Sequence, residues 1–112
     1  MQGSISLLVL NVVATAAIAT GRGVTFAGAH SGAALAIFGV SRTSGAIGDL
    51  VPIDVIGTTL MEAGAAVTAG SAVEVDSVGR CINFATGVKV GRALSAAAAA
   101  GTMVEVQIIA GV

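Results

Sequence analysis

Glycine interrupts this chain of 112 residues 16 times, and most of the segments between the glycines are short. Three of these segments, residues 73–76, 88–90 and 104–108, alternate apolar and polar residues with a period of two. Such alternation is typical of a strand with one face in a core and the other in water. Residues 6–13, 34–40 and 50–56 are richer in Val, Ile and Leu, which indicates more buried strands. The sequence therefore predicts an all-β fold, a small single-domain β-barrel or sandwich of short strands.

The alanine-rich tract at residues 95–100 has the highest helix propensity in the chain, but six residues support at most one short helical turn. Two pairs of segments look alike. Residues 21–27 are echoed by residues 79–85, and residues 48–56 by residues 101–109. These similarities suggest two pseudo-repeated halves, each with a turn, a strand, a loop and a second strand. Convergent patterning of short strands is the alternative explanation.

Charged residues make up only 10% of the chain, while apolar residues make up 55% and consist largely of Ala and Val. This is less than half the usual charged fraction of a soluble domain, so we expect partners to cover much of the surface. The five Lys and Arg residues form no basic stripe, which argues against nucleic-acid binding. Residues 1–21 are uncharged, but scattered polar residues and the lack of a preceding Lys or Arg argue against a membrane span or a signal peptide.

Few residues of the chain carry chemistry. His30, the only histidine, has no neighbouring carboxylate or cysteine in sequence, and Cys81, the only cysteine, has no motif around it. A general base needs a positioned partner and a metal site needs several ligands. We therefore expect a protein that is not an enzyme and that holds no cofactor and no metal. A small ligand-binding β-barrel with a site dispersed over loops stays open as a less favoured alternative.

Residues 53–58, Ile-Asp-Val-Ile-Gly-Thr, are followed by Glu-Ala-Gly-Ala-Ala-Val-Thr-Ala-Gly at residues 62–70. Further on, Gly-Arg-Ala-Leu at residues 91–94 runs into the alanine tract and then into the strand-like residues 104–108. In these sequence motifs and in their order along the chain, roughly residues 20–110 resemble the capsid decoration (cement) proteins of tailed phages, most closely those of Mu-like, transposable phages.

The resemblance implies a mostly β structural protein, a minor capsid protein made in the cytoplasm of a host bacterium. It would decorate and stabilise the outer surface of the mature capsid in the virion. Its partners would be the major capsid protein and further copies of itself, in a homotrimer, with a dimer as the alternative. Another self-assembling virion component, such as a tail or fibre element, would share the same composition.

The N-terminal residues 1–20 are expected to form an uncharged strand or arm, and residues 21–112 the β domain, within one domain overall. An exposed apolar strand is an aggregation hazard, so the strand at residues 5–13 should pair with its own core or with a neighbouring subunit. Arg22 and Arg80 occupy equivalent places in the first pair of similar segments. The candidate residues of an oligomer or capsid interface are Ile5, Leu7, Leu8, Val9, Arg22 and Arg80.

Overall fold

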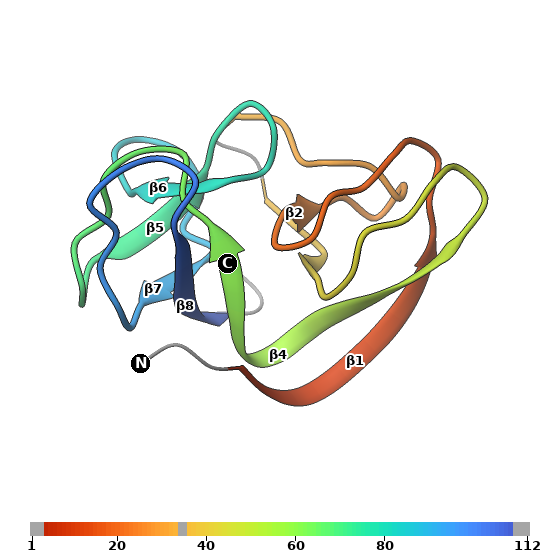
Figure 1. Ribbon diagram of the computed structural model, residues 1–112, viewed down its shortest axis with the longest axis horizontal. Helices are drawn as coiled ribbons and strands as arrows, with labels where there is room; N and C mark the ends of the chain where they lie inside the picture. Colours follow the sequence, from red (N-terminus) through yellow and green to blue (C-terminus); the bar gives the residue numbers. More distant parts are fainter. Residues whose placement is uncertain (1–3, 34–35, 109–112) are drawn as a thin grey trace.

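The computed structural model describes residues 4–33 and 36–108, which form strands, bridges and turns with no helix (Figure 1). The eight strands are β1 (Ile5–Val13), β2 (Gly23–Val24), β3 (Gly39–Ser41), β4 (Leu50–Glu62), β5 (Ala72–Val75), β6 (Cys81–Asn83), β7 (Gly91–Ala93) and β8 (Met103–Ile108). The predicted all-β fold is confirmed. The alanine tract forms bends and a turn instead of a helical turn. Within the described residues, no helix is long and apolar enough to cross a membrane.

Strand β4 organises the sheet because both of its edges are paired. β1 runs antiparallel to residues 50–58 along one edge, from Val13 opposite Leu50 to Ile5 opposite Thr58. The other edge pairs first with β3 and then with β8. In Figure 1, β1 and β4 form a bowed two-stranded ribbon along the lower side of the molecule, with shorter strands above it.

The sheet nearly closes into an antiparallel barrel. Its strand order is β2-β3-β4-β8-β7-β5-β6, with β1 on the remaining edge of β4. β6, at the end of this path, returns to β4, because Cys81 forms a parallel bridge with Ala63 immediately after β4. A closed sheet leaves few unpaired edges, so the nine-residue β1 stands out as the longest strand of the described residues that pairs with a single strand.

The chain consists of two copies of one strand arrangement that meet within β4. β1, β2, β3 and the first part of β4 correspond to the last part of β4, β5, β7 and β8. Matching backbone contacts establish the correspondence: Ala14–Asp49 with Ala63–Thr102, Ile18–Gly45 with Val67–Ala97, Gly21–Ser41 with Gly70–Ala93, and Gly23–Val40 with Ala72–Arg92. We call residues 5–56 the first half and residues 57–108 the second half.

One of the two sequence similarities has the correct register. The segments that begin at Gly48 and Gly101 are equivalent, and both glycines have φ of +91°, a conformation that glycine adopts without steric cost. Residue 109, the last of the second segment, lies outside the described residues, as do residues 34 and 35 of a predicted strand.

The other similarity is out of register. Gly21 corresponds to Gly70, because both donate to carbonyls at the ends of β3 and β7. Gly79 corresponds to Gly28, because each donates to the carbonyl three residues before it. The two segments look alike because each begins with a Gly-Arg pair. These pairs lie at turns that are not equivalent in the duplicated fold.

Each half has its own apolar core, built from matching positions. The core of the first half contains Ala14, Ile18, Val24, Val51 and Ile53, and the corresponding residues of the second are Ala63, Val67, Val73, Val104 and Val106. The second core is larger and includes Val40 from the first half, which joins the two halves. Small and β-branched side chains suit these narrow cores.

The backbones also approach closely at matching places. A Cβ atom at Gly39, where β3 begins, would collide with the carbonyl oxygen of Asp54. A Cβ at Gly91, where β7 begins, would collide in the same way with the carbonyl oxygen of Gln107. Glycine is therefore required at both positions by packing, which links the glycine spacing to the duplicated fold.

A buried carboxylate connects β1 to β4. Asp54 is 1% exposed and accepts hydrogen bonds from Ser6 Oγ at 2.5 Å and from Thr59 Oγ1 at 2.8 Å. Arg42 Nε lies 3.6 Å from Asp54 Oδ1 and balances its charge. A buried carboxylate is stable only when its oxygens are satisfied in this way.

We expect Asp54→Ala to lower the free energy of unfolding by about 2–4 kcal/mol, because it leaves two hydroxyls and the Arg42 guanidinium without their acceptor. Asp49→Ala is the matched control, since Asp49 accepts a bond from Ala46 N at an exposed turn, and should cost less than about 1 kcal/mol. Urea unfolding at one protein concentration measures both variants. Equal losses would contradict the structural role of Asp54.

Candidate interaction surface

The surface of β1 and of the adjoining part of β4 is apolar and exposed. Leu7 is 74% exposed and Leu50 is 67% exposed, although both lie within strands. We define the β1–β4 patch as Ile5, Leu7, Leu8, Leu10, Val13, Leu50 and Ile56, all large apolar side chains with substantial exposure. Many exposed large apolar side chains on two paired strands indicate an interaction site.

The backbone of β1 adds to this surface. β1 pairs with β4 along one edge, and within residues 4–33 and 36–108 no strand pairs with its other edge. The register slips between Ser6 and Leu8 and again between Leu8 and Val9, which is typical of a β-bulge. An apolar edge strand is a template for association with another chain unless something covers it.

Three of the residues expected at an interface lie in the patch, namely Ile5, Leu7 and Leu8. Val9 is half-buried. Leu50 and Ile56 of the patch could not be predicted from the sequence, because their proximity to β1 follows from the strand register. Leu10 and Val13 belong to the same uncharged run as Ile5, Leu7 and Leu8, so the sequence alone could have indicated them.

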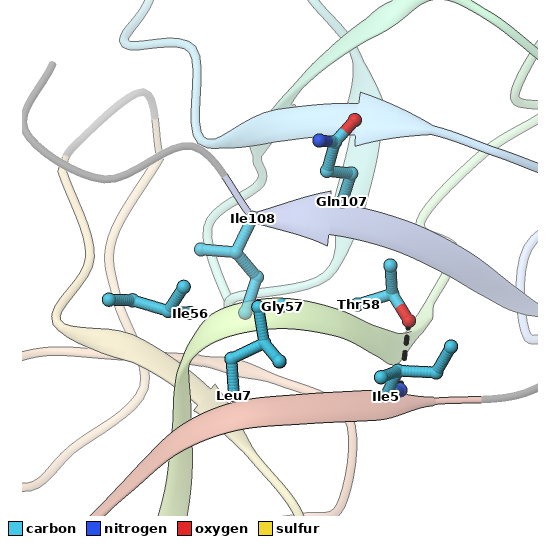
Figure 2. Close-up of a pocket in the computed structure, with 7 residues that line it drawn as sticks. All are labelled: Ile5, Leu7, Ile56, Gly57, Thr58, Gln107 and Ile108. Carbon is cyan, nitrogen blue, oxygen red and sulfur yellow. Dashed lines mark hydrogen bonds between the residues drawn. The ribbon is translucent and has the colours of Figure 1, made fainter.

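A shallow hollow of about 250 Å³ opens at one end of the patch. Figure 2 shows Leu7 of β1, Ile56 of β4 and Ile108 of β8 gathered around Gly57. Ile5 lies beside them, and its backbone N donates to Thr58 Oγ1 at 2.9 Å. The side chains around the hollow are apolar with two neutral polar groups, Thr58 and Gln107, so the hollow suits an apolar side chain of a partner and offers no reactive group.

The structure brings Arg22 and Arg80 together at Glu62. Arg22 Nη2 lies 3.2 Å from Glu62 Oε1, and Arg80 Nη1 lies 4.0 Å from Glu62 Oε2. Arg80 Nε also donates to Asp76 Oδ2 at 3.0 Å. Both arginines are thus partly buried in ion pairs. The Arg22–Glu62 pair joins the two halves, whereas both carboxylates that contact Arg80 lie in the second half. The sequence could not show this because Glu62 is distant from both in the chain.

His30 and Cys81 have structural surroundings. His30 Nε2 accepts a hydrogen bond from Ala19 N at 2.9 Å, so this nitrogen carries no proton. Burial, with a smaller contribution from the charge of Arg22, lowers the pKa of His30. Burial and the nearby Asp76 carboxylate raise the pKa of the Cys81 thiol to about 12, so it stays protonated and unreactive.

The acidic residues, the histidine and the cysteine of the described part of the chain form no metal centre. Across residues 4–33 and 36–108, no three His, Cys, Asp or Glu side chains lie close enough together to hold a metal ion. Glu74, which is 4% exposed, accepts bonds from the backbone N of Ala85 and Thr86 and thus serves the 84–87 loop. The β1–β4 patch is therefore the feature that points to function, and it indicates association with other proteins.

Comparison with known proteins agrees with a role in association with other proteins. The family model described as phage cement protein matches residues 3–108. Among solved structures, the base of the head fibre gp8.5 of bacteriophage phi29 is similar, with a TM-score of 0.78 and 16% sequence identity. The match covers 91% of this chain and 93% of that one, and at this identity it shows a shared fold. A search of the curated proteins gave no significant match.

The chain belongs to the phage cement protein family, since the family model covers nearly its whole length. It is a structural, non-enzymatic protein that decorates the capsid surface of the virion. The expectation of a capsid decoration protein is confirmed.

The His30 contact makes stability depend on pH. Because the pKa of His30 is lowered in the folded state, the unfolded state binds more protons as the pH falls below the ordinary value of 6.5. We expect the free energy of unfolding to decrease from pH 7.5 to pH 5.5, and to decrease less in His30→Gln, which keeps an acceptor without titrating. Urea unfolding at both pH values measures this, and an identical decrease in the two proteins would contradict it.

Proposed function

We propose that the protein binds the major capsid protein as a homotrimer and that the β1–β4 patch forms the contact between its copies. The observation that carries this proposal is the exposure of seven large apolar side chains around a strand with one unpaired edge. Burying one such side chain at an interface contributes about 1.5–3 kcal/mol. Residues 1–20 thus supply one side of the contact, on a body formed by residues 21–112.

The low charge of the chain supports the same proposal. Only 11 of 112 residues are charged, and most of them are engaged within the chain, so charge does little to keep copies apart. Apolar interfaces of this kind are typical of permanent oligomers.

The resemblance to decoration proteins supports a trimer over a dimer. Antiparallel pairing of the free β1 edge with its own copy would give a two-fold dimer. Side-chain packing of three β1 strands around an axis would give the trimer and would match a three-fold position of a capsid lattice. The same resemblance, through residues 51–70 and 91–94, supports a phage of the Mu-like, transposable type.

The proposed role requires only binding energy. A protein that binds the assembled shell and not its free subunits stabilises the shell by its binding free energy. A trimer engages several capsid subunits at once, so its three contacts reinforce one another. The lattice then resists the outward pressure of packaged DNA.

We expect Leu7→Ser with Ile56→Ser to raise the dissociation constant of the oligomer at least tenfold, because both side chains are exposed in the monomer and line the same hollow. Val78→Ser is the matched control, since Val78 is an exposed apolar residue of the turn between β5 and β6 and lies outside the patch. Light scattering coupled to size-exclusion chromatography on a dilution series measures the oligomer. A wild-type chain that stays monomeric at every concentration, or a double variant that associates normally, would contradict the proposal.

The likeness to a head-fibre base favours one second candidate, a base that anchors a further component to the head. The two candidates differ in their effect on the shell. A cement protein makes heads that lack it more resistant to heat when it is added back, whereas a base for another component binds without this effect. Heat release of DNA from heads with and without the protein separates the two.

A further inference from the structure

A second hollow lies at the outer side of the second half, away from the residues of the β1–β4 patch. It is an open groove of about 450 Å³ beside β5 and β7. We call it the cationic groove and define it by Gly70, Ser71, Ala72, Phe84, Lys89 and Arg92. The proposed function uses none of these residues.

The groove holds two cations that form no ion pair with a carboxylate of the described residues. Arg22, Arg42 and Arg80 form ion pairs with Glu62, Asp54 and Asp76. Lys89 and Arg92 complete the five Lys and Arg residues, and no carboxylate among the described residues lies within ion-pair distance of either. The chain has a net charge of -1, yet this groove is positive.

Both side chains are held in place without an anion. Lys89 Nζ lies 5.1 Å from the centre of the Phe84 ring, within the range of a cation–π contact. Arg92 Nη1 donates to the carbonyl oxygen of Gly70 at 2.6 Å, which leaves its other N–H groups for a ligand. The groove therefore presents two positioned cations beside an aromatic wall.

The duplication shows what the same face does in the first half. Residues 70, 71, 72, 89 and 92 correspond to Gly21, Arg22, Gly23, Ile37 and Val40. That equivalent face is covered by the second half of the chain. Gly23 N donates to Gly79 O at 2.7 Å, and Arg22 Nη1 donates to Val78 O at 3.2 Å. This face of the fold thus receives a protein turn in one half and stands open in the other.

The residues that differ between the two faces indicate the chemistry of the missing partner. Ile37 and Val40 pack against the apolar core of the second half. In the open face, Lys89 and Arg92 replace them. A segment that covers the open face must therefore supply carboxylates where the second half supplies apolar side chains.

We propose that the cationic groove receives an acidic segment of the major capsid protein and is the contact that docks the oligomer on the shell. This inference rests on the proposed shell binding. A second copy is the poorer occupant, because its turn equivalent to residues 76–79 is residues 25–28, Thr-Phe-Ala-Gly, which carries no carboxylate. Binding by charge also suits a surface that must stay soluble before it meets the shell.

The test compares two double variants with the same net charge of -3. Lys89→Gln with Arg92→Gln removes both cations of the groove, whereas Ala98→Glu with Ala100→Glu adds two negative charges on the exposed alanine tract. Each protein is mixed with expanded heads that lack it, and co-sedimentation at several salt concentrations gives the dissociation constant. Light scattering reports the oligomer of each variant in parallel.

We expect the groove variant to keep the wild-type oligomer, to bind heads at least tenfold more weakly and to lose most of the salt dependence of binding. The control should bind within about threefold of wild type. Unchanged binding of the groove variant would overturn the inference and leave the groove as a solvated end of the fold. Loss of the oligomer in the groove variant would also overturn it and identify a second copy as the occupant. Failure of the wild-type protein to bind heads would instead overturn the proposed function itself.

Discussion

The structure depends on hydrogen bonding along both edges of β4. β4 pairs with β1 and β3 of the first half and with β8 of the second half, so the two repeated units share one continuous strand. A fold that shares a strand in this way cannot separate its halves without breaking β4. The buried Asp54 carboxylate holds β1 to this strand through Ser6. The same pairing sets the position of the apolar side chains that β1 presents to solvent.

Small side chains explain both the compact halves and the exposed surface. With 55% apolar residues and only three aromatic rings, the chain fills two narrow cores and still has large aliphatic residues left over. Most of those that are exposed lie on β1 and β4, where no other part of the described chain covers them. Most of the few charged side chains form ion pairs within the chain, at Glu62, Asp54 and Asp76. Because exposed apolar side chains are many and unpaired charges are few, this distribution favours association with other proteins.

Local pattern was sufficient to predict β1, β5, β8, the first part of β4 and the existence of a repeat. It was wrong at residues 88–90, which lie just before β7, and at residues 36–38, which precede β3. The equivalent turns at Gly48 and Gly101 could be predicted because each precedes a similar apolar segment, although β4 is much longer than β8. The register of the first similarity failed because Gly-Arg pairs occur at two different turns. Long-range pairing was beyond a local pattern. The meeting of Arg22 and Arg80 at Glu62, and the contribution of Ile56 to the patch, depend on strand register. The cationic groove could not be predicted either, because Lys89 and Arg92 look like ordinary surface residues in the sequence. Their position becomes informative only beside the equivalent residues of the first half.

A cryo-electron microscopy map of the decorated head, at a resolution that shows side chains, is the most direct measurement of how this protein acts. The account predicts three copies around a three-fold position, with β1 and the exposed side chains of β4 buried between copies. A map in which copies make no contact through β1, or in which β1 faces solvent, would contradict it.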